Sequence, residues 1–230
     1  MAAAPAGEQT LLLFYGGTFD PVHNGHLAIA RHARDELAVP VRLMPAADPP
    51  HRPPPGADAM QRLRMLELAI ADETGLQVDT RELQRAARQP GVPSFTVDTL
   101  REIRAETGAT QPLALLMGAD SLLGLPTWHE WEHLLDLAHI VVAERPGSVL
   151  ETAMPAVLAE RLRGAWADTP AGLRGQAAGQ VWRLRQPLQA ESATAVRRLI
   201  ARGGHWQHLL PPAVAGYVAA HGLYGCNATA

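Results

Sequence analysis

The feature that most constrains the fold is an apolar run that ends in two glycines and leads directly into a helical pattern. The run TLLLFY, 10–15, is typical of a buried strand. The turn GGTFDPVHNGHL, 16–27, follows it, and the next apolar residues have the spacing of one helix face: Leu27, Ala30, Ala33 and Leu37. In a doubly wound α/β sheet, phosphates bind at this first turn, because helix N-terminal amides and the helix dipole face the ligand there.

Short apolar runs alternate with amphipathic stretches along the rest of the chain, which predicts a parallel sheet. Five further strand candidates are rich in Val, Leu and Ile: 41–45, 76–79, 112–118, 139–144 and 181–185. A helix between the second and third of the six strands is predicted by the spacing of four residues: Met60, Leu63, Leu66 and Ile70. We therefore expect a Rossmann-like, doubly wound α/β fold, with a mostly parallel sheet and helices on both faces.

The predicted organisation is a single domain over residues 1–230. Residues about 1–9 and 225–230 are expected to be poorly ordered tails, and the Gly/Ala-rich stretch 167–180 to be a flexible insertion. The N-terminal ten residues lack the basic segment and apolar core of a signal peptide, and no apolar run approaches the about 18 residues that cross a membrane. We expect a cytoplasmic protein with no membrane partner.

Composition excludes several classes of protein. A chain of 230 residues with 47% hydrophobic and 19% charged residues is an ordinary globular protein that can bury a core. The net charge of −3 argues against a protein that coats nucleic acid. The single cysteine, Cys226, excludes an internal disulfide and a zinc site built on paired cysteines. All 20 basic residues are arginine, so a cationic site must use the planar guanidinium fork.

His23 and His26, three residues apart in the first turn, admit four interpretations. They could be two ligands of a zinc site, although a third ligand is not evident nearby. They could be a general acid–base pair, or histidines packed in the core. The flanking glycines and the position before a helix favour a fourth interpretation, in which both histidines bind phosphate at the helix N-terminus.

The turn GGTFDPVHNGHL resembles the (G)GxFDPxHxGH signature of the nucleotidyltransferase superfamily. The resemblance implies that ATP contacts these residues: Gly16, Gly17, Thr18, Phe19, His23 and His26. This signature alone leaves several members open, including cytidylyltransferases, pantetheine-phosphate adenylyltransferase and, more remotely, class I aminoacyl-tRNA synthetases.

Later blocks resemble the bacterial nicotinate-nucleotide adenylyltransferase family more narrowly. MPAADPPHRP, 44–53, is similar to its PxxxPPHK segment, with Arg52 in the lysine position, which implies that His51 contacts the nicotinate nucleotide. PSFTVDTL, 93–100, is similar to SYTvdTL, which implies that Phe95 and Thr96 contact the nicotinate nucleotide.

Three more blocks complete the resemblance, which spans residues 11–224. In LMGADSLLGLPTWHEW, 116–131, it implies Gly118 and Asp120 at ATP and Trp128 stacked on the pyridine ring. HIVVAERPG adds Arg145 as a contact of the nicotinate nucleotide. ESATAVRRLI is similar to iSSTxiR, which implies phosphate contacts from three residues: Ser192, Thr194 and Arg197. Glu191 and Ala193 depart from that pattern.

The resemblance implies adenylyl transfer from ATP to nicotinate mononucleotide, which yields nicotinate adenine dinucleotide and pyrophosphate in NAD biosynthesis. Transfer would be direct and in line, with Mg²⁺ accompanying ATP and no metal site of the protein's own. The expected catalytic residues are His23, His26, Arg52 and Arg197. The alternatives are transfer to nicotinamide mononucleotide or another phosphate acceptor, a non-catalytic nucleotide-binding module, and a metal-dependent hydrolase. ATP and nicotinate mononucleotide are the expected partners, nucleic acid is not, and a homo-oligomer stays open.

Overall fold

A parallel sheet of six strands forms the centre of the molecule in the computed structural model, which describes residues 10–47, 56–144, 150, 152–185 and 191–226. The spatial order is β3-β2-β1-β4-β5-β6, and all five pairings are parallel. The strands are β1 (Leu12–Gly17), β2 (Val41–Pro45), β3 (Leu76–Val78), β4 (Leu113–Gly118), β5 (His139–Ala143) and β6 (Val181–Arg183). This order confirms the doubly wound prediction, and the chain changes direction across the sheet between β1 and β4.

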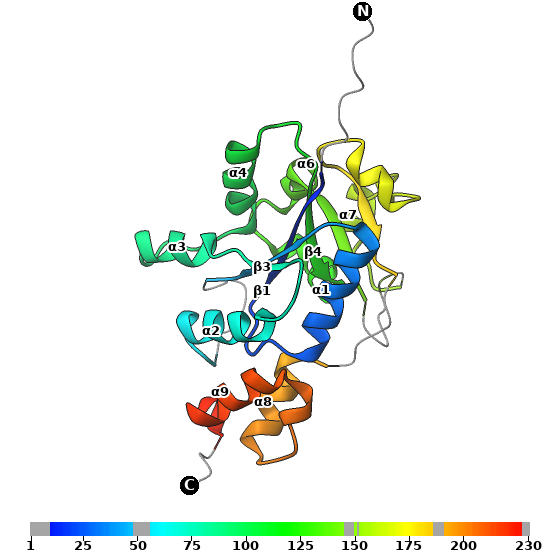
Figure 1. Ribbon diagram of the computed structural model, residues 1–230. Coiled ribbons are helices and arrows are strands. Elements are labelled where there is room, and N and C mark those ends of the chain that lie inside the picture. The colour runs from blue at the N-terminus through cyan, green and yellow to red at the C-terminus, as the bar shows by residue number, and fades with distance from the viewer. Residues whose placement is uncertain (1–9, 48–55, 145–149, 151, 186–190, 227–230) are drawn as a thin grey trace, which may run out of the picture.

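Helices cover both faces of the sheet (Figure 1). Side chains of one strand alternate between the faces, so that Leu13 and Tyr15 join one core and Phe14 joins the other. The first core includes buried side chains from four helices: α1 (Asn24–Leu37), α2 (Ala59–Ile70), α8 (Ala193–Ala201) and α9 (Pro212–Ala220). The second contains α4 (Thr96–Thr107), α5 (Ala119–Leu123), α6 (Leu134–Leu137) and α7 (Ala156–Arg161).

Short 3₁₀ helices connect these elements at η1 (Leu125–Thr127), η2 (Trp131–His133), η3 (Pro170–Arg174), η4 (Gln207–Leu209) and η5 (Leu223–Gly225). Along the described ranges, no helix is both long and apolar enough to cross a membrane.

The first strand begins and ends two residues later than the sequence pattern indicates. Gly16 and Gly17, which we expected in the turn, pair with Met44 and Pro45 in the parallel register of β1 and β2. The amide of Ala46 then donates to the Gly17 carbonyl oxygen at 2.8 Å. The turn into α1 therefore begins at Thr18.

One predicted helix buries a different face than expected, and another helix was not predicted. The helix predicted from Met60 is present as α2, but Met60 is 67% exposed, and the inward face includes Arg62, Met65 and Leu66. The buried face of α2 is turned from the predicted one, because Arg62 lies in the core, where hydropathy would not place an arginine. The helix α3 (Arg81–Arg88), which packs beside β2, was not predicted, because its eight residues contain a single large apolar side chain, Leu83.

Residues 167–180, for which we expected a flexible insertion, contact the sheet and its helices. Leu173 in η3 is fully buried, and the Arg174 guanidinium donates to the Leu37 carbonyl oxygen at the end of α1. The Ala177 carbonyl oxygen accepts from the Leu113 amide at 3.1 Å and from Arg104 at 2.6 Å. At the C-terminal end, the first residue of the predicted tail, Gly225, belongs to η5.

A buried arginine ties the carboxyl ends of β1 and β2 together. Arg62 has no exposed surface. Its Nη1 donates to the carbonyl oxygens of Thr18 at 2.9 Å and Ala46 at 2.6 Å, and its Nη2 donates to that of Ala47 at 2.7 Å. These carbonyl groups lie in irregular backbone, where sheet hydrogen bonds do not reach them, so the guanidinium supplies their donors.

Replacing Arg62 with Met should lower the free energy of unfolding by about 3 kcal/mol, because Met fills similar space but leaves buried carbonyl groups without their donor. Chemical denaturation measures this loss. The control is Arg64→Met on the same helix, where Arg64 is half-exposed and pairs with Glu67 at 3.2 Å. That variant should change stability by less than about 0.5 kcal/mol. Equal losses in the two variants would contradict the role given to Arg62.

Candidate functional site

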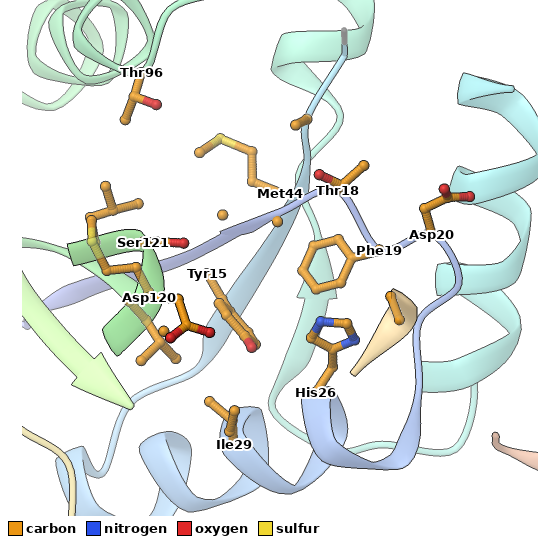
Figure 2. A pocket seen from close by; sticks show the side chains of 18 of the residues that line it. Tyr15, Thr18, Phe19, Asp20, His26, Ile29, Met44, Thr96, Asp120 and Ser121 are labelled. Carbon is orange, nitrogen blue, oxygen red and sulfur yellow. The ribbon is translucent and has the colours of Figure 1, made fainter. Parts of the chain in front are cut away.

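A cavity of about 600 Å³ opens at the carboxyl ends of β1 and β4. The turn after β1, the start of α5 after β4, and the starts of α1, α4 and α8 all contribute lining residues. Figure 2 shows His26 and Phe19 on one side of Tyr15, and Asp120 and Ser121 on the other. Helix N-termini carry partial positive charge, so a cavity where three helices of nine or more residues begin suits an anionic ligand.

His26, in the first turn of α1, is held so that one ring nitrogen is committed to the backbone. The His23 amide donates to His26 Nδ1 at 3.3 Å. Because Nδ1 accepts, the neutral imidazole carries its proton on Nε2. The Phe19 ring packs edge-on against the imidazole, with 5.1 Å between centroids. His26 therefore lines the cavity with a ring whose orientation is fixed and whose Nε2 carries the proton in the neutral form.

His23 occupies a different environment from His26. It is 1% exposed, does not line the cavity, and stacks on the His26 ring with 3.7 Å between centroids. His26 therefore lines the cavity and His23 contacts the His26 ring, while the contact of either histidine with phosphate stays a prediction. Its backbone begins α1: the His23 carbonyl oxygen accepts from the His26 amide at 2.9 Å.

Close packing shapes the turn between β1 and α1. A Cβ on Gly17 would lie 2.9 Å from the end of the Phe19 ring, so a larger residue would displace that ring. Phe19 has a φ of 49°, in the left-handed region that non-glycine residues seldom adopt. Its burial, at 1% exposure, holds this conformation. The turn thus keeps one shape with its backbone close to the cavity.

The late helix α8 brings its first turn and one arginine to the cavity. The Ser192 hydroxyl caps the helix by accepting from the Ala195 amide at 3.2 Å. Ala193 and Thr194 line the cavity, as does Arg197. Arg197 also has protein partners, because its Nη1 donates to the Asp20 carbonyl oxygen at 2.6 Å. The Arg197 guanidinium is therefore held at one end by the backbone of the first turn.

Other parts of the cavity lining carry residues predicted to contact ATP and the nicotinate nucleotide. Gly118 ends β4, and Asp120 stands in the first turn of α5, where the sequence placed it. Thr96 at the start of α4 and the half-buried Trp128 after η1 also line the cavity. The site therefore combines a cationic and amide-rich wall with a wall that holds a carboxylate and an aromatic face.

Known proteins resemble this chain along nearly its whole length. Residues 14–199 match the cytidylyltransferase-like family. A Stenotrophomonas maltophilia protein named probable nicotinate-nucleotide adenylyltransferase is 64% identical, over 94% of this chain and 97% of its own. A Xylella fastidiosa protein of the same name is 50% identical, over 95% and 98%. The chain belongs to the nicotinate-nucleotide adenylyltransferase family.

The fold is shared beyond these relatives. A Plasmodium falciparum nicotinic acid mononucleotide adenylyltransferase, solved in complex with NaAD, superposes with a TM-score of 0.71 over 95% of this chain and 98% of its own. Its sequence identity is 13%, so this likeness concerns the fold alone.

Most of the residues predicted for this adenylyltransferase family member meet at the cavity. Those that line it are Gly16, Gly17, Thr18, Phe19, His26, Thr96, Gly118, Asp120, Trp128, Ser192, Thr194 and Arg197. Phe95 does not line it: this residue caps α4, and its ring packs against His129 with 4.2 Å between centroids. His51, Arg52 and Arg145 lie outside the described residues.

Two acidic residues of the cavity were missed by the sequence interpretation. Asp20, which we read only as part of a turn, is 3% exposed and lines the cavity. Glu82, from α3, is 7% exposed and lines it as well. Asp20 stands inside the signature and could have been found there. Glu82 gives no local signal, since a glutamate in a charged helix normally faces solvent.

Glu82 belongs to a hydrogen-bond network behind the start of α4. The Thr99 hydroxyl donates to its carboxylate at 2.9 Å, and Arg85 donates from Nη2 to Ser94 Oγ at 2.7 Å. Burial raises the pKa of the Glu82 carboxyl, and the bond from Thr99 and the charge of Arg85 oppose this shift only in part. These bonds connect α3 to the Thr99 side chain in α4 and to the Ser94 side chain just before that helix.

Replacing Glu82 with Gln should flatten the dependence of stability on pH. Because the folded pKa of Glu82 is raised, the folded chain binds more protons than the unfolded chain between the ordinary and the raised pKa. The unfolding free energy should therefore fall as pH rises through that window, and Gln, which does not titrate, should remove this part of the fall. Urea denaturation from about pH 4 to about pH 8 measures both profiles. Parallel profiles would contradict the shift.

Proposed function

We propose that this chain transfers the adenylyl group of ATP to the phosphate of nicotinate mononucleotide, forming nicotinate adenine dinucleotide and pyrophosphate in NAD biosynthesis. The observation that carries the proposal is the meeting of His26, Arg197 and Trp128 around one cavity, with the starts of α1 and α8 beside them. The named relatives, matched along 94% or more of the chain, support the same reaction.

The reaction needs alignment rather than a base. The acceptor phosphate is already an anionic nucleophile at neutral pH. One of its oxygens forms a bond to the α-phosphorus of ATP, the bond from that phosphorus to the bridging oxygen breaks, and the electron pair leaves on pyrophosphate. The protein contributes by holding the two phosphates in line and by stabilising the charge that grows on the leaving group.

The described residues supply these two contributions from one wall. The His26 Nε2–H donates to a phosphate oxygen, and its orientation is already fixed by the His23 amide. Thr194 and the N–H groups of Arg197 that face the cavity bind the pyrophosphate end, where the dipole of α8 also favours negative charge. Asp120 accepts hydrogen bonds from ribose hydroxyls across the cavity.

The second substrate lies toward Trp128 and the start of α4. The indole offers a flat face for the pyridine ring. Thr96 and the first amides of α4 favour a carboxylate over a neutral amide, because the helix N-terminus is positive. By resemblance, His51, Arg52 and Arg145 are further proposed contacts of the nucleotides.

Mg²⁺ enters with ATP in this proposal. Among the described residues, no group of three or more His, Cys, Asp or Glu side chains could hold a metal ion. In this proposal the ion is bound chiefly by phosphate oxygens and water, as Mg²⁺ commonly is with nucleotides, while the cavity residues bind the phosphates themselves. The ion supplies neutralisation of the triphosphate charge.

A substrate comparison tests the proposal. Purified protein is given MgATP with nicotinate mononucleotide or with nicotinamide mononucleotide, and dinucleotide and pyrophosphate are measured together. We expect equimolar dinucleotide and pyrophosphate, with higher kcat/KM for the nicotinate substrate. Product from neither acceptor would overturn the proposal, and ATP binding without pyrophosphate release would identify a non-catalytic nucleotide-binding module. Preference for nicotinamide mononucleotide would contradict the role given to α4.

A further inference from the structure

The carboxylate of Asp20 joins segments that are far apart in the sequence. It accepts hydrogen bonds from the amides of Gly56 at 2.7 Å and Ala57 at 3.0 Å, and from the Tyr224 hydroxyl at 2.8 Å. Arg197 Nη1 lies 3.5 Å from the same carboxylate and 2.6 Å from the Asp20 carbonyl oxygen. We call Asp20, Gly56, Arg197 and Tyr224 the C-terminal clamp.

The clamp is closely packed as well as hydrogen-bonded. A Cβ on Gly56 would lie 3.0 Å from two carbons of the Tyr224 ring and 3.5 Å from Arg197 Cδ. The absence of a side chain at Gly56 therefore lets the Tyr224 ring and the Arg197 stem lie over the backbone. A methyl group there would have to displace the ring.

The chain turns sharply to bring Tyr224 into the clamp. Gly222 and Gly225 have φ values of 59° and 79°, and Tyr224 itself has a φ of 57°. A residue with a Cβ seldom adopts this left-handed conformation, so contacts made by its side chain must hold it. The bond to Asp20 is such a contact, and burial together with the Asp20 charge raises the pKa of the Tyr224 phenol, which keeps it a donor.

Tyr224 does not line the cavity itself, but it contacts a residue that does. Arg197 and Asp20 line the cavity, whereas Tyr224 does not. The phenol and the Ala57 amide both donate to Oδ1 of Asp20, while Arg197 is nearest to Oδ2. If the phenol is lost, the carboxylate loses one donor, and the guanidinium is the adjacent cation that can replace it. Arg197 would then move toward Asp20 and away from the cavity.

We propose that Tyr224 is a positioning residue for the triphosphate, which acts through Asp20 to keep the Arg197 guanidinium at the cavity. This inference rests on the proposed function, in which Arg197 binds the pyrophosphate end of ATP. It assigns the C-terminal segment a part in binding ATP, although that segment provides no lining residue after Arg197 among those described.

The test is a double-mutant cycle on full-length protein with MgATP and nicotinate mononucleotide. Tyr224→Phe should lower kcat/KM for ATP about fivefold, the size of one hydrogen bond, chiefly through KM for ATP. The KM for the mononucleotide should stay unchanged. In an Arg197→Ala background, Tyr224→Phe should have less than about a twofold further effect, because its route to the substrate is gone.

Two variants make the cycle specific. Tyr217→Phe, on α9, removes the hydroxyl group from a ring that stacks on His221 outside the clamp, and it should leave both KM values unchanged. Gly56→Ala, which disturbs the ring without removing the hydroxyl, should raise KM for ATP as Tyr224→Phe does. Agreement of these results supports the clamp.

Other outcomes overturn the inference and separate it from the proposed function. An equal effect of Tyr224→Phe in both backgrounds, or an equal rise of both KM values, would show a merely structural role. If wild-type protein forms no dinucleotide, the proposed function fails, and titration calorimetry with MgATP runs the same cycle on binding alone. Additive losses of ATP affinity there would overturn the clamp, and non-additive losses would support it.

Discussion

The site depends on the hydrogen bonds that the buried guanidinium of Arg62 donates to the backbone. The guanidinium donates to carbonyl oxygens from the turn after β1 and from the residues after β2, so two strand ends share one cation. A charge with no exposed surface is tolerated in a core only where hydrogen bonds replace its water. Because these bonds fix the turn after β1, they also fix the backbone that leads to Phe19, Asp20 and His26.

The turn after β1 carries a negatively charged carboxylate and a hydrogen-bond donor, each with its own partners in the protein. The Asp20 carboxylate is turned to Gly56, Ala57, Tyr224 and Arg197, so protein donors satisfy it near the position proposed for phosphate. His26 follows in the same turn with Nδ1 bound to the backbone and Nε2 as a donor. Pre-oriented donors of this kind stabilise developing charge without reorganising during the reaction, which is the main requirement of phosphoryl chemistry.

The sequence predicted what local pattern determines. The apolar run, the glycines and the helical spacing predict the strand, the turn and α1, and parallel order follows from repetition of that unit. Thr96, Asp120 and Arg197, which were predicted from separate sequence blocks, line the same cavity, because each stands at or near a helix start at the carboxyl edge of the sheet.

What the sequence missed depends on contacts between distant residues. Tyr224 and Asp20 are 204 positions apart, and the cavity contact of Glu82 depends on how α3 packs beside β2. Arg62 lies on the buried face of α2 because carbonyl groups of the loops accept its hydrogen bonds, and a hydropathy pattern does not show those groups. His23 and His26 look equivalent in the sequence, but in the structure only His26 lines the cavity, and His23 stacks on its ring.

The turnover of His26→Ala and His26→Gln, measured beside wild-type protein, tests most directly whether a fixed Nε2 donor stabilises the leaving pyrophosphate. His26→Ala should lose about 10²–10³-fold in kcat, and its unfolding free energy should change by no more than about 1 kcal/mol. His26→Gln should recover part of the loss, because its side-chain amide offers a donor near the same position. Near-wild-type turnover of His26→Ala would contradict this role of His26.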